Sequence, residues 1–278
     1  MTPARRLLRA FLAILWLWPA TTLAQVEQWR SHMDAGVKAY QQYNYPEAEK
    51  QLTAAVKEAE QFGPEDLRLA TTLSSLAAVY RGQGRPAAAE SLHKRSLAIL
   101  EKALGPEHPD VAQSLNKLAW VYMFQRRSAE AILLLKRALE INEKALGPEH
   151  PDVGQSFNNL ALLHQHQGRF AEAEPLHKRA LAIREKALGP ENTRVAITLN
   201  NLAFLYKHQG KYAEAEPLYK RSLAILEKAL GPEHPDLVGG LKNYAALLRK
   251  TGRGEEAEKL EARAKTIRAK DAREKAPR

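Results

Sequence analysis

The chain contains no cysteine among its 278 residues, so it can form no disulfide, thiolate metal site, thiol nucleophile or cysteine-linked lipid anchor. Glycine and proline are also few, at 15 each, and aromatic residues make up only 7%. There is no glycine-rich phosphate loop, no Gly-x-Ser-x-Gly motif and no His-Glu-x-x-His motif. With 45% apolar and 27% charged residues, the composition is still that of a globular protein. We therefore expect a folded protein that is not an enzyme and uses no cofactor.

The first 24 residues have the pattern of a secretory signal. Arg5, Arg6 and Arg9 form a basic start, an apolar stretch spans 12–18, and small residues at 22–24 suit a cleavage site. The alternative is a retained membrane anchor, but this apolar run is shorter than the roughly 20 residues that cross a bilayer. We expect residues 1–24 to be a signal peptide that is removed, and the protein to be periplasmic or secreted from a bacterium.

Positive charge is concentrated at the two ends of the chain. The 42 Lys and Arg residues exceed the 32 Asp and Glu residues by ten. Three arginines lie in the leader, and the segment 259–278 holds eight basic residues against three acidic ones. The body between them is almost neutral, whereas a nucleic-acid-binding protein is expected to carry a basic face on its folded body. We expect no nucleic-acid partner, and membrane contact only through the signal peptide or the basic tail.

A fixed internal period dominates the rest of the sequence. The motif Ala-Leu-Gly-Pro-Glu begins at Ala103, Ala145, Ala187 and Ala229, each 42 residues after the last. Self-similarity at such a period indicates an array of repeats. The predicted organisation is an N-terminal stub at 25–29, a degenerate repeat at 30–70, four repeats over 71–238 (71–112, 113–154, 155–196 and 197–238), a C-terminal capping repeat at 239–268 and a basic tail at 269–278.

Each copy contains two helix patterns. Helix A opens at a proline, such as Pro109, and shows apolar residues at three- and four-residue steps. Helix B runs from Tyr212 to Leu230 in one copy and ends at Gly231. A single helix pair cannot bury its apolar stripe, so the pairs must stack into a continuous core. The sequence predicts an all-α solenoid of antiparallel helix pairs.

Three segments of the copy at 197–238 carry a family resemblance. They are Leu-Asn-Asn-Leu-Ala-x-x-Tyr at 199–206, Gln-Gly-Lys-Tyr-Ala-Glu-Ala-Glu-Pro-Leu-Tyr-Lys-Arg at 209–221 and Leu-Gly-Pro-Glu-His-Pro-Asp at 230–236. This pattern resembles the 42-residue tetratricopeptide repeat of kinesin light chains and related bacterial proteins. The resemblance implies a right-handed superhelical solenoid whose inner groove is lined by helix A residues. Because one fold serves many partners, it is far less specific for function.

The helix A residues that packing does not require form the candidate peptide-binding groove. The set is Ser74, Ser75, Arg81, Gln113, Asn116, Lys117, Trp120, Met123, Phe124, Gln155, Asn158, Asn159, Leu162, Gln165, His166, Ile197, Asn200, Asn201, Phe204, Lys207, His208, Lys242, Asn243, Arg249 and Lys250.

This set suits an extended peptide. The asparagine side chain has both a hydrogen-bond donor and an acceptor, which a peptide backbone needs. Asn116, Asn158 and Asn200 place such a side chain at the same position in successive copies, as a ladder along the groove. Aromatic residues such as Phe204 supply area for an anchor side chain, and basic residues such as Lys207 favour acidic ligands. The alternative is that the asparagines belong to the repeat pattern and touch no ligand. Kinesin light chain grooves accept short acidic peptides with an aromatic residue, so the resemblance implies a similar partner.

The expected function is therefore a non-enzymatic scaffold that binds an extended segment of another protein or a peptide. The alternative is an envelope assembly or spacer factor whose basic tail contacts anionic lipid or polysaccharide. His166 and His208 occupy the same position in adjacent copies, but no third ligand accompanies them, and we expect no metal site. The sequence carries no indication of the oligomeric state.

Overall fold

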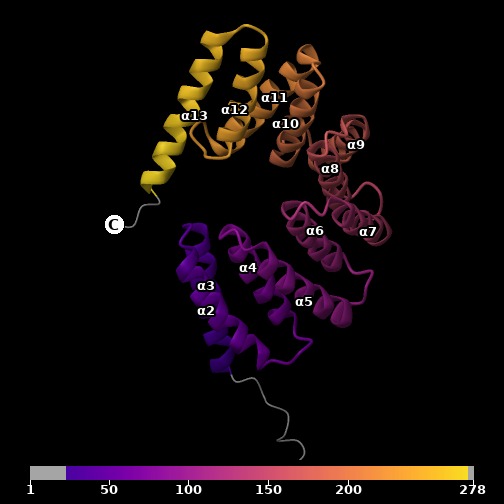
Figure 1. Cartoon of the computed structure of the whole chain (residues 1–278), viewed down its shortest axis with the longest axis vertical. Coiled ribbons are helices and arrows are strands. Elements are labelled where there is room, and N and C mark those ends of the chain that lie inside the picture. The colour runs from indigo at the N-terminus through magenta and orange to yellow at the C-terminus, as the bar shows by residue number, and fades with distance from the viewer. Residues whose placement is uncertain (1–22, 275–278) are drawn as a thin grey trace, which may run out of the picture. The chain divides into compact units, whose positions relative to one another are not determined.

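The computed structural model describes residues 23–274, and this part of the chain consists of twelve α-helices with no strand. They form two compact units that divide after Ala103 (Figure 1). The first unit contains α2 (Leu23–Gln41), α3 (Tyr45–Glu60), α4 (Leu67–Gly82) and α5 (Pro86–Leu104). The second contains α6 (Pro109–Phe124), α7 (Ser128–Leu146), α8 (Pro151–His166), α9 (Phe170–Leu188), α10 (Thr193–His208), α11 (Tyr212–Leu230), α12 (Leu237–Lys250) and α13 (Gly254–Glu274).

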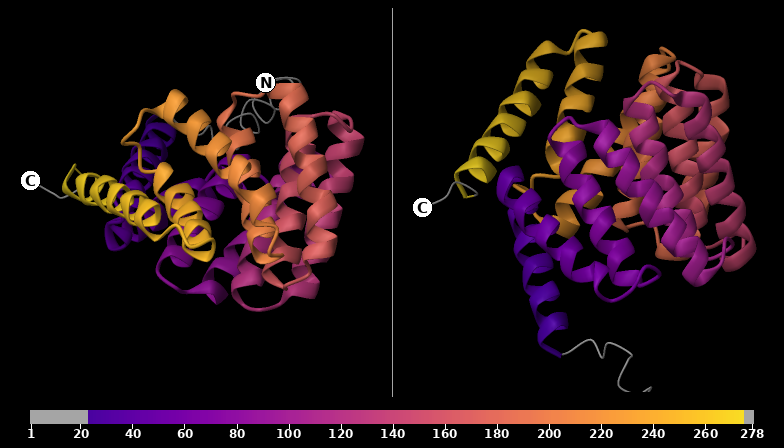
Figure 2. Two further views of the ribbon diagram at one scale, coloured as in Figure 1. Left: turned by 90° about the horizontal axis from the view of Figure 1, so that it is seen from above. Right: turned by 60° about the horizontal axis from the view of Figure 1, so that its bottom comes forward.

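Helices pack with their neighbours in the sequence. In the second unit α6 packs on α7, α8 on α9, α10 on α11 and α12 on α13, and each pair packs on the next (Figure 2). In the first unit α2 packs on α3 and α3 packs on α4. Each pair thus buries its apolar stripe against the pair beside it, which is how repeat arrays build a core. The prediction of an all-α solenoid of helix pairs is confirmed.

The predicted signal peptide lies outside the described residues, apart from Leu23 and Ala24, which begin α2. Among the described helices, none combines the length and the apolar character that a bilayer span requires.

Polar side chains cap the helix A elements at their N-termini. His108 and His150 stand just before α6 and α8, and the ring Nδ1 of each accepts a hydrogen bond from a backbone N–H two residues later, at 3.2 Å. Asn192 caps α10 in the same way through Oδ1, at 2.9 Å. His234 makes the equivalent bond, although α12 begins at Leu237 and not at the repeat's proline. These residues therefore satisfy free backbone donors at the helix starts.

The turn between helix A and helix B requires a left-handed backbone. Four glycines occupy it, namely Gly84 (φ 72°), Gly168 (φ 73°), Gly210 (φ 76°) and Gly252 (φ 78°). In the copy at 113–154 the position is held by Arg126, with φ 61°. A side chain is strained in this region, whereas glycine adopts it freely.

We expect the substitution Arg126→Gly to stabilise the protein because it relieves this strain. The gain should be roughly 0.5–1 kcal/mol after the larger chain entropy of glycine is deducted. The matched variant Gly210→Arg should lower the free energy of unfolding by a similar amount. Chemical unfolding of both variants measures the two changes, and a loss of stability in Arg126→Gly would contradict the explanation.

One helix B position is a buried packing slot in successive copies. In the second unit it holds Leu135, His177 and Tyr219, which are exposed by 4%, 0% and 0%. His177 forms a polar contact of 3.3 Å between Nε2 and Gln165 Oε1. Burial, with a smaller contribution from the positive charge of Arg184, lowers the pKa of His177 to about 4. The imidazole is therefore neutral in the folded protein near neutral pH, as its role in packing predicts.

The same slot in α13 holds a charged residue. The Glu261 side chain is 43% exposed and pairs with Arg249 at 2.7 Å. Ala264 and Ile267 of the same helix are buried against the core of the second unit. Helix α13 continues to Glu274, so the segment expected as a basic tail from 269 begins as helix.

Exposed ion pairs connect the helix B elements from α5 to α13 with the loop before the preceding helix A. They join Lys102 to Glu65 (2.7 Å), Lys144 to Glu107 (2.6 Å), Lys186 to Glu149 (3.0 Å), Lys228 to Glu191 (2.7 Å) and Lys270 to Glu233 (2.5 Å). Single exposed pairs contribute little stability. Their regular recurrence shows that charge, like apolar packing, follows the repeat from one copy to the next.

The buried His177 makes stability depend on pH. The unfolded chain binds a proton near the ordinary histidine pKa of 6.5, and the folded chain binds it only near 4, so stability is lost as pH falls through this interval. We expect His177→Tyr, which copies Tyr219, to reduce the loss by on the order of 2 kcal/mol. Unfolding of the variant and the wild type between these pH values measures the difference. Parallel curves for the two proteins would contradict the assignment.

Candidate functional site

The helix A elements of the second unit lie next to one another, with α6 against α8, α8 against α10 and α10 against α12. An open pocket of about 390 Å³ forms where α8, α9, α10 and α12 meet. It is lined by Gln165, His166, Phe170, Asn200, Asn201, Phe204, His208 and Asn243, and we call it the Phe204 pocket. All of these residues except Phe170 belong to the groove set predicted from the sequence.

Aromatic rings form one side of the Phe204 pocket. The His208 ring lies 4.3 Å from the Phe204 ring and is stacked with Phe170 at 5.8 Å, measured between centroids. The Lys207 Nζ sits 4.7 Å from the centre of the Phe204 ring, within range of a cation–π contact. The pocket can therefore receive an apolar or aromatic side chain beside rings that are already packed against one another.

The charge around this pocket is positive. Burial lowers the pKa of His208, and the nearby Lys207 lowers it further. Burial likewise lowers the pKa of Lys207, with a smaller contribution from Lys250. Among the described residues, no acidic side chain lines the pocket. Lys207 is a partly desolvated cation beside a pocket whose described lining contains no acid, and this favours a ligand that carries negative charge.

The asparagines are engaged with one another. The Asn159 side chain donates to Asn116 Oδ1 at 3.1 Å, and Asn201 donates to Asn158 Oδ1 at 3.1 Å. Asn243 donates to Asn200 Oδ1 at 3.3 Å. These bonds tie each helix A to the next.

The asparagine side chains that form these hydrogen bonds differ in exposure along the array. Asn158 and Asn159 are only 2% and 5% exposed. The predicted ladder of amides is therefore wrong at Asn158, and Asn159, which was predicted as a groove residue only, is likewise enclosed by the packing. Asn200 and Asn243 remain half-buried and line the Phe204 pocket, so they still present polar groups to it.

Other predicted groove residues lie elsewhere. Trp120 and Met123 line a smaller apolar pocket with Leu135 and Leu163. Phe124 and Ile197 are 59% and 50% exposed. Of the remainder in the second unit, Gln113, Lys117, Lys242, Arg249 and Lys250 are exposed, whereas Gln155 and Leu162 are half-buried. Ser74, Ser75 and Arg81 lie on α4 in the first unit.

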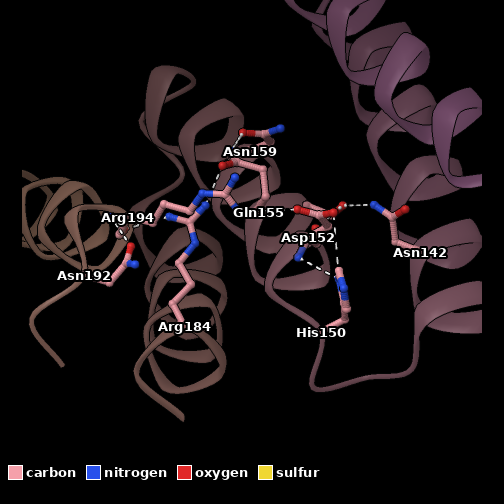
Figure 3. Close-up of polar contacts among 9 residues, drawn as sticks. Asn142, His150, Asp152, Gln155, Asn159, Arg184, Asn192 and Arg194 are labelled. Carbon is pink, nitrogen blue, oxygen red and sulfur yellow. Dashed lines mark hydrogen bonds and ion pairs between the residues drawn. The ribbon is translucent and has the colours of Figure 1, made fainter. Parts of the chain in front are cut away.

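A polar cluster that the sequence analysis did not identify surrounds Arg184 (Figure 3). This helix B side chain is 1% exposed and reaches between α8 and α10. Its Nη1 donates to Thr198 Oγ1 at 2.6 Å and to the Arg194 carbonyl at 3.1 Å, and its Nη2 donates to Gln155 Oε1 at 2.5 Å. Burial is the main cause that lowers the pKa of Arg184 to about 10, so it stays charged near neutral pH.

In residues 23–274, no three histidine, aspartate or glutamate side chains gather closely enough to hold a metal ion. Glu174, whose pKa is lowered to about 2, accepts from Lys178 at 2.7 Å, Lys211 at 3.1 Å and Tyr206 at 3.3 Å. The hydrogen bond from Lys178 is the largest cause of that shift. This carboxylate joins one repeat to the next.

Comparison with known proteins places the chain in a family. Residues 35–102, 70–144, 125–186 and 194–270 each match the tetratricopeptide repeat family. Curated protein sequences include none with significant similarity to the chain.

Solved structures are similar over most of the chain. BtubC (BKLC) from P. vanneervenii is 26% identical, with 89% of this chain and 92% of that chain covered and a TM-score of 0.63. A putative kinesin light chain from Podospora anserina, with nearly identical repeats, is 31% identical over 76% of this chain and 98% of its own, with a TM-score of 0.60. A Rap protein solved with competence and sporulation factor shares the fold at 18% identity, over 92% of this chain and 79% of its own, with a TM-score of 0.64.

The family matches extend over most of the chain, and the repeat period and the Podospora structure agree with them. The chain therefore belongs to the tetratricopeptide repeat family, and its 42-residue repeat is of the kinesin light chain-like type.

Proposed function

We propose that the protein is a non-enzymatic scaffold that binds an extended peptide segment of another protein in the Phe204 pocket and along the neighbouring helix A elements. The observation that carries this proposal is the combination of rings and amides on one open surface. Phe170, Phe204 and His208 offer a place for an apolar anchor, and Asn200 and Asn243 offer hydrogen bonds beside it. Anchors of this kind supply most of the binding energy in protein interfaces.

The partner segment is acidic and contains an aromatic residue. Lys207 and Lys250 place positive charge at the pocket, and its described lining contains no acid. An aromatic side chain fits the space beside Phe204 and His208 with favourable ring contacts. The Rap protein solved with competence and sporulation factor supports binding as a use of this fold. The basic, apolar start of the sequence supports export to the periplasm or beyond the cell.

The alternative function relies on the basic C-terminal segment. Part of its charge is already neutralised within the repeat array, because Arg263 pairs with Glu227 at 2.6 Å and Lys270 pairs with Glu233 at 2.5 Å. These contacts favour a structural role for α13. Binding measured at increasing ionic strength distinguishes the two functions. Binding through the tail alone should be lost at high ionic strength, whereas binding through an apolar anchor should persist.

We expect peptides selected against the protein from a random library to be rich in acidic and aromatic residues. Phe204→Ala should weaken their binding by about tenfold or more, because it removes one wall of the pocket. Lys250→Glu should also weaken it by reversing an exposed charge without disturbing the core. Fluorescence anisotropy with a selected peptide measures both effects.

The matched control is Leu133→Ala, which truncates an apolar side chain that is 67% exposed on α7, away from the pocket. It should bind like the wild type, and circular dichroism melts verify that every variant is folded. Equal affinity of Phe204→Ala and Leu133→Ala for the selected peptide would contradict the proposal.

A further inference from the structure

Arg184 and Arg194 depart from the repeat pattern, and both bring positive charge to the same part of the second unit. Where helix B has Arg184, the neighbouring copies have Asn142 and Leu226. Where α10 has Arg194 in its first turn, the neighbouring copies have Asp152 and Asp236. An acid is favourable at a helix start and a base is not. The Arg194 substitution therefore works against stability, and the Arg184 side chain lies next to its backbone, between α8 and α10 (Figure 3).

Arg184 is a buried cation whose hydrogen bonds all go to neutral groups. They are Gln155 Oε1, Thr198 Oγ1 and the Arg194 carbonyl oxygen, and its buried Nε lacks a partner within the described part of the chain. A buried charge without an opposite charge is costly. Asp152 is the carboxylate whose charge acts on Arg184, and it is itself paired with Arg194 at 3.6 Å.

The packing around Arg184 accommodates this side chain. Gly154 stands where other copies have Ala112 and Ala196. A Cβ at Gly154 would lie 3.2 Å from Arg184 Cγ and 3.3 Å from Ile183 Cγ2. The absence of that Cβ makes room for the stem of the arginine, so the charged group is held in a fitted position.

Gln155 stands between this guanidinium and the groove. It occupies the groove-facing position that Ile197 holds in the next copy, where that side chain is 50% exposed. Besides accepting from Arg184, Gln155 donates to Asn159 Oδ1 at 2.6 Å. Its amide oxygen is a neutral acceptor at a place where a carboxylate oxygen would bind the same nitrogen more strongly.

We propose that Arg184, Arg194 and Gln155 form a carboxylate-binding site at the edge of the groove between α8 and α10. The ligand carboxylate displaces the Gln155 side chain and accepts hydrogen bonds from the Arg184 guanidinium. The Arg194 side chain, which is 52% exposed, adds positive charge from the solvent side. The planar fork of arginine matches the two oxygens of a carboxylate.

This proposal rests on the proposed function, because the carboxylate belongs to the bound peptide. It comes from an acidic side chain or from the C-terminus of that peptide. The two sources share one chemistry and are distinguished by small probes. N-acetylglycine carries a carboxylate like that of a chain terminus, N-acetylaspartic acid amide carries one like that of a side chain, and acetamide is a neutral control.

The experiment is an NMR titration of the full, ¹⁵N-labelled chain with each probe at constant ionic strength. We expect a saturable shift of the Gln155 side-chain amide and the Arg184 Nε–H signals with the carboxylates, and no shift with acetamide. The probe with the higher affinity identifies the source of the carboxylate. Absence of a saturable shift with both carboxylates would overturn the proposal.

Two variants test the residues themselves. Arg184→Leu copies Leu226, which is 7% exposed in the next repeat, and Arg194→Asp restores the residue found in other copies. Each should weaken carboxylate binding by about tenfold or more, read from the Gln155 amide signal. Thermal melts verify that both variants are folded. Unchanged affinity in both variants would overturn the site.

The outcomes for the two proposals are distinct. Peptide binding that requires Phe204 but not Arg184 contradicts the carboxylate site and leaves the proposed function standing. Peptide binding that does not require Phe204 contradicts the proposed function, whatever the small carboxylates do.

Discussion

A helix pair of this length cannot bury its own apolar face, and each pair in this chain therefore depends on the pair beside it. The fixed period of 42 residues is the direct consequence, because the same residue must meet the same neighbour in every copy. Leu135, His177 and Tyr219 occupy one slot for this reason and are buried alike. Polar contacts obey the same constraint, as the asparagine pairs between successive helix A elements demonstrate.

The same constraint distinguishes structural residues from candidate functional ones. A residue that recurs with the period and contacts the next copy is explained by stacking. Residues that break the pattern and cost stability need another explanation, and Arg184, Arg194 and Gly154 are the clearest instances. The Phe204 pocket is a third kind of feature, since its rings lie on the repeat's open surface and its central ring is not repeated in the neighbouring copies. Phe204 stands where the neighbouring copies have Leu162 and Ala246.

Periodicity and capping made much of the fold predictable. The ends of α11 follow from its apolar periodicity and from the glycine after it, and an asparagine before α10 is a typical N-cap residue. Most residues of the Phe204 pocket were also predictable, because helix A positions that packing leaves free recur at a known spacing. Phe170 was missed because it begins helix B, and only the packing of α9 against α10 brings its ring beside His208. The burial of Asn158 was missed because one amide looks the same in sequence whether it faces a ligand or a neighbouring amide.

The central claim is that a partner segment lies along the helix A side of the second unit. Site-specific photo-crosslinking in cells tests it most directly, with benzoylphenylalanine at His208 in the pocket and, separately, at Leu133 on α7. The account predicts that the His208 probe captures one partner through a single extended segment with acidic and aromatic residues, and that the Leu133 probe does not. Capture of the same partner from Leu133 but not from His208 would contradict it.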